Sequence, residues 1–192
     1  MTPASERIVW CDADLSDDGL YRYRLTRRWG SANDPSICWI MLNPSTADAV
    51  EDDPTIRRCI RFSEAWGFGS LIVVNLFALR STDPKGLLDA VDPIGPDNDH
   101  AIRLASLEAN RCIAAWGTKG GYRHRNADVI RLVTDDCMED MHALAITKDG
   151  HPKHPLYVKG DTKPTLYRGQ VPADQIPERA VRALATAAEE RP

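Results

Sequence analysis

The stretch Ile37-Cys-Trp-Ile-Met-Leu-Asn43-Pro44 decides how the rest of the sequence is interpreted. An apolar run without polar alternation is typical of a strand buried on both faces, as in a parallel sheet. Pro44 disfavours the helical conformation at Asn43, so the strand should end there in an extended backbone. The Asn43 carboxamide would then lie at the carboxyl edge of the sheet, where open α/β sheets bind their ligands.

Three further apolar segments predict the other core strands, at residues 71–77, 112–116 and 141–147. Stretches that favour helix separate the strands, at residues 54–65, 99–109 and 126–133. Asp53 is expected to cap the first of these helices. Strands that alternate with helices favour a parallel sheet with both faces covered. We therefore predict an α/β fold, a three-layer α/β/α arrangement with a central four-stranded parallel sheet.

Residues 1–30 predict an N-terminal β-hairpin beside this core, with arms at residues 7–11 and 21–29 and an acidic turn between them. The second arm alternates like a half-exposed strand, which predicts a solvated face for its four arginines. At the other end, Ala-rich residues 173–190 predict a closing helix. We expect a single domain over residues 1–192, with its core at residues 37–160.

Composition limits the class of protein. The 192 residues, of which 43% are apolar and 27% charged, suffice for one globular domain. A net charge of −4 does not indicate a nucleic-acid binder, although a local basic groove could still contact phosphates. The N-terminus lacks a signal-peptide pattern and no apolar run reaches the ~20 residues that span a bilayer, so we expect a cytoplasmic protein, monomeric and without membrane contact.

The five cysteines are widely spaced and form no Cys-x-x-Cys pair. Metal or iron–sulfur ligation requires clustered thiolates, so the spacing predicts reduced, mostly buried cysteines. We predict no metal and no cofactor.

Conspicuous residues end all four predicted core strands: Asn43, Asn75, Trp116-Gly117 and the loop at residues 148–157, which contains His154. The carboxyl ends of parallel strands lie side by side, so these residues should converge on one crevice. A carboxamide places a donor beside an acceptor, which matches a nucleobase edge, and imidazole can stabilise a leaving anion. The set suits cleavage of an N-glycosidic bond, and does not suggest a kinase, dehydrogenase or thiol enzyme.

Structural alternatives exist for each of these residues. Asn43 could only tie its side chain to the following loop, and Asn75 could be satisfied by a neighbouring loop. Trp66 and Trp116 suit a hydrophobic core better than a stacking surface. His151 is expected to be inert. Four hydroxyl residues could be caps or turn residues, or could hold phosphate: Ser45, Thr46, Ser81 and Thr82.

The order of the motifs resembles the uracil-DNA glycosylase superfamily, whose members carry Asn-Pro or Asp-Pro after the first core strand, Asn on the second and a His-Pro loop after the fourth. The matching residues are Asn43-Pro44, Asn75 and His154-Pro-Leu-Tyr157, with Trp116-Gly117 after the third strand. The sequence is more closely similar to a bacterial and phage family known as domain of unknown function 1643. That similarity rests on residues 43–48, 53–59 and 75–84 and on the His-Pro-Leu-Tyr loop.

The superfamily resemblance implies a role for each residue. Asn43 would position the attacking water and favour a positively charged sugar, but as a neutral group it cannot be a general base. Asn75 would bind the edge of the base, and His154 would donate to the base oxygen that gains charge. Phe62 and Phe77, with Trp66, are candidates for stacking on the base. The expected phosphate and nucleic-acid contacts are Ser45, Thr46, Ser81, Thr82, Lys153, Tyr157 and Lys159.

We therefore expect a monofunctional N-glycosylase-like protein that binds a flipped or single-stranded, deaminated or modified base. The partner would be DNA, or RNA or a nucleotide, held at a basic edge, because residues 148–168 contain five basic side chains and two Asp. One departure from the better-known glycosylases is the acidic loop after Pro44, with Asp48, Glu51, Asp52 and Asp53. Two alternatives stay open: a non-catalytic nucleobase or nucleic-acid binding module, and an enzyme that acts on free nucleotides or nucleosides.

Overall fold

The structure of the protein is a computed structural model that describes residues 8–45, 52–81 and 85–169. Its strands are β1 (Trp10–Leu15), β2 (Arg22–Arg28), β3 (Ser36–Met41), β4 (Ser70–Asn75), β5 (Cys112–Ala114), β6 (Met141–Ala143) and β7 (Thr165–Leu166). Its helices are α1 (Pro54–Ala65), α2 (Lys85–Asp89), α3 (Asn98–Glu108) and α4 (Arg125–Arg131), with shorter helical turns η2 (Thr118–His124), η3 (Leu132–Asp136) and η4 (Pro155–Tyr157).

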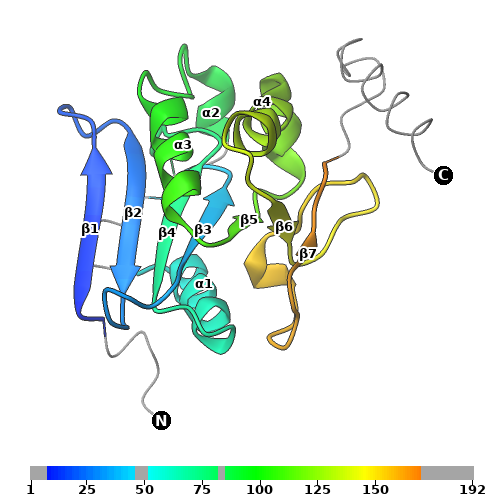
Figure 1. The fold of residues 1–192 in the computed structure, drawn as a ribbon. Coiled ribbons are helices and arrows are strands. Elements are labelled where there is room, and N and C mark those ends of the chain that lie inside the picture. Colours follow the sequence, from blue (N-terminus) through cyan, green and yellow to red (C-terminus); the bar gives the residue numbers. More distant parts are fainter. Residues whose placement is uncertain (1–7, 46–51, 82–84, 170–192) are drawn as a thin grey trace.

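Within the described residues, seven strands form one mixed sheet in the order β1-β2-β4-β3-β5-β6-β7 (Figure 1). The four central strands, β4, β3, β5 and β6, run parallel. The hairpin strands β1 and β2 extend one side of the sheet and β7 the other, each by antiparallel pairing. The predicted α/β class is confirmed, but the sheet is larger than the four-stranded parallel sheet that we expected.

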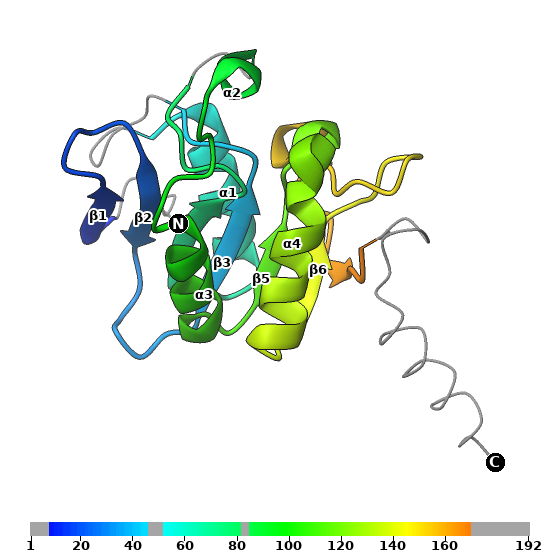
Figure 2. The ribbon, with the colours of Figure 1, turned by 90° about the horizontal axis from the view of Figure 1, so that it is seen from above.

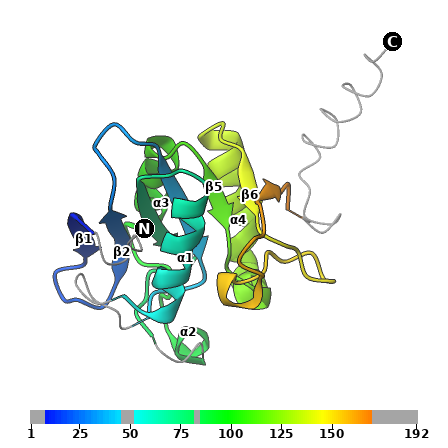
Figure 3. The same ribbon diagram turned by 90° about the horizontal axis from the view of Figure 1, so that it is seen from below.

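Helices cover both faces of the sheet. Helices α3 and α4 lie on one face and α1 on the other, as the views from above and below show (Figure 2, Figure 3). Neighbouring residues of β3 serve the two cores: Ile40 packs in the cluster that contains Ile102 and Val129, whereas Trp39 packs in the cluster that contains Ile60. Burial on both sides explains why the apolar run does not alternate with polar residues.

Helix α1 has the bounds that the sequence predicted. The Asp53 carboxylate accepts a hydrogen bond from the Ile56 amide at 2.8 Å, and Pro54 occupies the first turn, where its missing N–H costs nothing. Its inward face is formed by Ile56, Cys59, Ile60 and Ser63, which are all buried.

The hairpin differs from its prediction in two ways. Strand β1 runs on to Leu15, so the first part of the expected acidic turn is strand. The solvated arginine face is wrong for Arg22 and Arg27, which are 3% and 1% exposed. Strand β2 pairs with β1 on one side and β4 on the other, which places it inside the sheet. Arg27 is compensated there by Asp52, whose carboxylate lies 2.8 Å from its Nε.

Other differences concern the second half of the chain. Strands β5 and β6 are three residues each, shorter than expected, because the backbone leaves the sheet for the loops at their carboxyl ends. The predicted closing helix at residues 173–190 lies outside the described residues. Cys11 is exposed, and the other four cysteines are buried. None of the described helices is both long and apolar enough to cross a bilayer.

The carboxyl end of β4 is held by a buried polar network. The Asn98 Nδ2 donates to the carbonyl oxygens of Asn75 at 3.1 Å and Leu76 at 3.0 Å. The Leu76 oxygen also accepts a hydrogen bond from Arg125 Nε at 2.8 Å, and Arg125 in turn pairs with Asp99. Helices α3 and α4 therefore fix the backbone from which the Asn75 side chain projects.

Replacement of Asn98 by Ala should destabilise the fold by about 1–3 kcal/mol, because it leaves buried carbonyl oxygens with fewer donors. Asn110 provides the control: its Oδ1 accepts a hydrogen bond from the Ser36 amide at 2.9 Å, but at an exposed position where water can replace it. Urea denaturation of Asn98→Ala, Asn110→Ala and the wild type measures both effects. An equal loss in the two variants would contradict the proposed anchoring.

Candidate functional site

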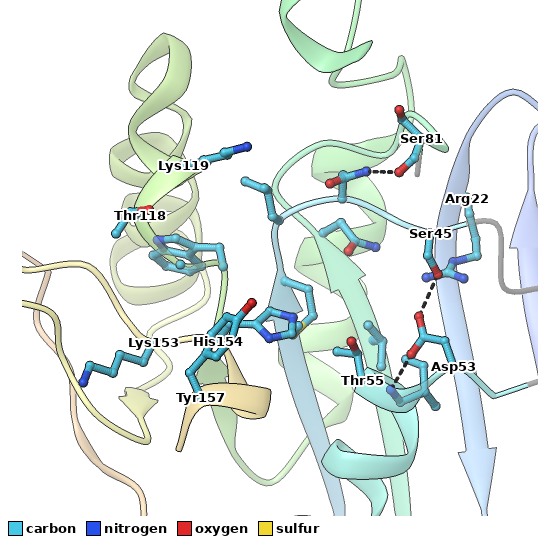
Figure 4. Close-up of a pocket in the computed structure, with 18 of the residues that line it drawn as sticks. Arg22, Ser45, Asp53, Thr55, Ser81, Thr118, Lys119, Lys153, His154 and Tyr157 are labelled. Atoms are coloured by element: carbon cyan, nitrogen blue, oxygen red, sulfur yellow. Dashed lines mark hydrogen bonds between the residues drawn. The ribbon is translucent and has the colours of Figure 1, made fainter. Parts of the chain in front are cut away.

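A cavity of about 640 Å³ lies at the carboxyl ends of the parallel strands. Asn43, Asn75 and His154 all line it, although they come from the ends of β3 and β4 and from the loop after β6. Figure 4 shows His154 between two groups of charged residues, with Arg22 and Asp53 on one side and Lys119 and Lys153 on the other. The convergence expected from the strand ends is therefore present.

Asn43 has a side chain held in one orientation. Its Nδ2 donates to the carbonyl oxygens of Ser81 at 2.8 Å and Pro44 at 3.1 Å. The Ser81 amide donates back to the Pro44 oxygen at 3.1 Å, so the loops after β3 and β4 are joined by reciprocal bonds. Asn43 thus does tie the loops together, but through its amino group, which leaves the Oδ1 without a hydrogen bond from any described residue.

Asn75 is 1% exposed, and its Nδ2 has no hydrogen-bond partner among the described residues. Leaving a buried amide donor unpaired costs about 1–3 kcal/mol. The alternative that a neighbouring loop satisfies this side chain finds no support in the described residues. An unpaired buried donor in the wall of a cavity is typical of a site that binds an acceptor.

His154 is oriented by its own loop. Its Nδ1 accepts a hydrogen bond from the Leu156 amide at 3.4 Å, so the proton of the neutral ring is on Nε2. Burial lowers the pKa of His154 below its ordinary value, and the Asp53 carboxylate partly opposes that shift. The Tyr157 ring lies 5.8 Å from the imidazole, centroid to centroid. The site therefore contains a neutral imidazole with one N–H to donate.

The His-Pro loop is anchored to two neighbouring elements. The Gly117 amide, at the end of β5, donates to the Pro152 oxygen at 2.9 Å. On the other side, Arg58 of α1 donates to the Val158 oxygen at 2.7 Å. Both bonds hold the loop over the ends of the strands, which explains how His154 reaches the cavity there.

One end of the cavity carries a charged corner, formed by Arg22 and Asp53, that sequence reasoning missed. Arg22, from β2, faces Asp53 there, and burial lowers the pKa of its guanidinium to about 10 while Asp53 raises it. Asp53 is fully engaged, because one carboxylate oxygen accepts from Ser45 Oγ at 2.7 Å and the other from the Ile56 amide. The sequence showed an Arg-rich strand that contains Arg22. Its place in the cavity wall, however, follows only from the pairing of β2 with β4.

Lysines occupy the opposite end of the cavity. Lys119 and Lys153 are exposed residues that line it, from the loops after β5 and β6, and neither forms an ion pair with a described carboxylate. Thr118 and Tyr157 lie beside them. Lys119 directly follows Trp116-Gly117-Thr118, in the loop after β5. The rule that located Asn43 and Asn75, that residues at the carboxyl ends of parallel strands line the site, would also have located Lys119.

The structure separates the remaining predicted site residues into three groups. Ser45, Ser81, Lys153 and Tyr157 line the cavity. The described lining does not include Lys159, which is exposed, or the stacking candidates Phe62, Phe77 and Trp66. Thr46 and Thr82 lie outside the described residues.

The two phenylalanines are core residues rather than stacking surfaces. Phe62 is 2% exposed and packs against both Trp39 and Trp66, with Arg58 over its ring. Phe77 is fully buried beneath the α3 and α4 face. Because their rings are already covered by protein, the stacking role that we expected for them is wrong.

Trp116 is both a core residue and part of the cavity wall. It is 2% exposed, packs edge-on against Tyr167 and lines the cavity. Gly120 makes this position possible, because a Cβ there would clash with the indole Cδ1 of Trp116.

No three His, Cys, Asp or Glu side chains among the described residues are arranged to hold a metal ion. The donors that line the cavity include amide, hydroxyl, imidazole, guanidinium and ammonium groups, which suit an organic or anionic ligand.

Comparison with known proteins identifies the family. The sequence model of the family described as "Protein of unknown function (DUF1643)" matches residues 22–156. The chain belongs to this family. The matched region begins at Arg22 and ends within the His154-Pro-Leu-Tyr157 turn, so it includes the strand-end residues that line the cavity.

No curated protein matches the chain. Among solved structures, it is similar to a chain of the hetero-hexameric glutamate dehydrogenase from Thermus thermophilus in its leucine-bound form, with 12% identity and a TM-score of 0.31. That match covers 68% of this chain and 30% of the dehydrogenase chain. A similarity this low carries no argument about fold or function.

Replacement of Gly120 by Ala should destabilise the protein by about 1–3 kcal/mol, because the added methyl group overpacks the Trp116 indole. Gly121→Ala is the matched control, since the nearest atom to its Cβ would be His151 Cε1 at an ordinary 3.5 Å. Thermal unfolding followed by tryptophan fluorescence compares the two. If both glycines tolerate the substitution equally, the Trp116 wall is not as rigid as described.

The lowered pKa of His154 predicts a pH-dependent stability. The unfolded chain binds this proton first, near the ordinary pKa of 6.5, while the folded chain still holds a neutral ring. The stabilisation is complete above pH 6.5 and is lost as the pH falls through the folded pKa. His154→Gln should therefore lose less stability than the wild type on acidification from above to below pH 6.5. Parallel pH dependences of the two melting temperatures would contradict a buried neutral imidazole.

Proposed function

We propose that the cavity binds a nucleobase and that the protein hydrolyses its N-glycosidic bond, as in the uracil-DNA glycosylase superfamily. The single observation that supports this is the convergence of Asn43, Asn75 and His154 on one cavity from three separate strand ends. Two carboxamides and a neutral imidazole provide polar groups for the edge of a planar heterocycle, and the nucleophile is water, so no nucleophilic side chain is required.

Asn43 contributes an oriented carbonyl dipole. Its amino group is bound to Ser81 and Pro44, so the Oδ1 can hold the attacking water and favour a positively charged sugar. A neutral amide cannot remove the proton of that water, so the proton passes to the departed base or to solvent as the C–O bond forms and after the C–N bond breaks. The reaction therefore depends on how well the departing base carries negative charge. The main catalytic effect then comes from groups that contact the base rather than from groups that contact the water.

His154 stabilises the departing base. Its Nε2–H is the free donor of the ring, since Nδ1 accepts from Leu156. A preorganised donor aimed at an oxygen that gains charge contributes a factor of about 10²–10³ in rate. Neutral imidazole suits this task because burial disfavours the charged form. Asn75, in the cavity wall, would bind the edge of the same base.

The nucleic-acid backbone would lie at the lysine end of the cavity. Lys119 and Lys153 have no described carboxylate partner, so phosphates can pair with them at the rim. The base must leave the duplex or be single-stranded to reach Asn75, which lies in the interior wall.

Glycosylase assays test this proposal. Single- and double-stranded oligonucleotides that contain uracil, hypoxanthine, xanthine or a modified base are incubated with the protein, and abasic sites are cleaved with alkali. Asn43→Ala and His154→Ala should each slow cleavage about 10²-fold or more, because each removes a group specific to the transition state. His151→Ala is the matched control, from the same loop but outside the described lining of the cavity.

A second candidate function is a base-binding module without catalysis. The neutral Asn43, which provides no general base, favours it. Salt-dependent binding of the same oligonucleotides without cleavage would assign that function. Turnover of free nucleosides or nucleotides alone would assign the site to a small-molecule enzyme, and neither binding nor turnover in any arm would contradict a nucleobase site.

A further inference from the structure

Tyr157 is an exposed aromatic residue in the wall of the cavity. Its side chain lines the cavity, yet 80% of the residue is exposed. Figure 4 shows it beside His154, at the end of the cavity that carries Lys119 and Lys153. A tyrosine usually buries much of its apolar ring, so a ring left in water at the mouth of a binding site calls for a reason.

The turn that carries Tyr157 is fixed by its own hydrogen bonds. The Tyr157 amide donates to the His154 oxygen at 3.0 Å, and the next residue, Val158, accepts from Arg58 at 2.7 Å. The Tyr157 ring lies 5.8 Å from the imidazole of His154, centroid to centroid, with 52° between the two planes. A ring on a turn held in this way loses little conformational freedom when a ligand covers it.

Exposed cations lie at the same end of the cavity as Tyr157. Apart from His154, the basic side chains in the described lining are Arg22, Lys119 and Lys153, and Arg22 is only 3% exposed. The two lysines can pair with the phosphates of one strand. At the end that carries Asp53, the described lining offers no exposed cation to a second strand.

We propose that Tyr157 stacks on the nucleotide next to the bound base, and that the substrate is single-stranded nucleic acid. Aromatic side chains beside cations that follow one backbone are the usual means by which proteins hold a single strand. The bound base enters toward Asn75 while its neighbour stays at the mouth, where Tyr157 presents an exposed ring. This inference rests on the function proposed above, because it concerns the same cavity.

A single strand also suits the buried position of Asn75. A base that reaches this residue, which is 1% exposed, must give up its stacking, and in a duplex it must give up its pairing as well. Its departure uncovers one face of the neighbouring base. Stacking of that face on Tyr157 replaces part of the lost contact, so the exposed ring lowers the cost of placing the base in the cavity.

Removal of one neighbouring base tests the inference. The probe is a strand of thymines around uracil, hypoxanthine or xanthine, whichever the wild type binds most tightly, with adenine on each side. The central base is attached to a carbocyclic sugar, which resists hydrolysis. In two further strands an abasic spacer replaces one adenine or the other, and fluorescence anisotropy compares the affinities. One spacer should weaken binding to the wild type about 5- to 150-fold, the value of stacking one base on an aromatic side chain.

Variants assign that loss to one side chain. Tyr157→Ala should bind the intact and the spacer strands equally, whereas Tyr157→Phe should keep the full loss, because the ring covers the base. Leu156→Ala is the matched control, from the same turn, 45% exposed and outside the described lining of the cavity, and it should also keep the loss. The ratio of two affinities within one variant does not depend on the fraction of folded protein.

Four outcomes would overturn the inference and leave the nucleobase site intact. They are a wild type that is insensitive to both spacers, a loss that is unchanged in Tyr157→Ala, a loss that disappears in Leu156→Ala, and a duplex with the same central base that binds as tightly as the single strand. Failure of the wild type to bind any of the strands would overturn the proposed function as well.

Discussion

Parallel pairing of β3 with β4, in a register that places Met41 beside Asn75, is the constraint on which the site depends. The backbone ladder continues past the strands, since the Leu76 and Phe77 amides donate to the oxygens of Met41 and Leu42 at 2.9 and 3.0 Å. A slip of one residue would turn Asn75 to the opposite face of the sheet. The two carboxamides therefore share a cavity only because two apolar strands pair in this one register.

Much of this arrangement could be predicted because it follows from local chemistry and from one topological rule. Helix α1 was predicted to the residue, since Asp53, Pro54 and the apolar spacing all act within the helix. The strand ends were found from their break in apolar character. What could not be predicted is the chemistry that depends on tertiary pairing: the burial of Arg22 follows from the position of β2 between β1 and β4. The core positions of Phe62 and Phe77 likewise follow from side-chain packing, which an aromatic residue beside a motif does not reveal.

Acidic and basic side chains lie at opposite ends of the cavity. The acidic loop after Pro44 is unfavourable for a DNA-binding face, but the two described carboxylates of that loop are both engaged. Asp52 pairs with Arg27, and Asp53 caps α1 and accepts from Ser45. The opposite rim carries Lys119 and Lys153. An acidic protein can therefore present a cationic approach to the cavity while its described carboxylates stabilise the fold.

The fold also explains why residue 43 is Asn rather than Asp. Its Nδ2 donates to two carbonyl oxygens, of Ser81 and Pro44, and these bonds join the loops after β3 and β4. A carboxylate has no donor, so in the same position it would face both carbonyl oxygens with a negative charge. The hydrogen bonds that join the two loops require an amide at residue 43, and this requirement excludes a carboxylate general base there. In a hydrolase built this way, departure of the base must be driven from the side of His154, which makes the reaction depend on the leaving group rather than on the strength of the attacking water.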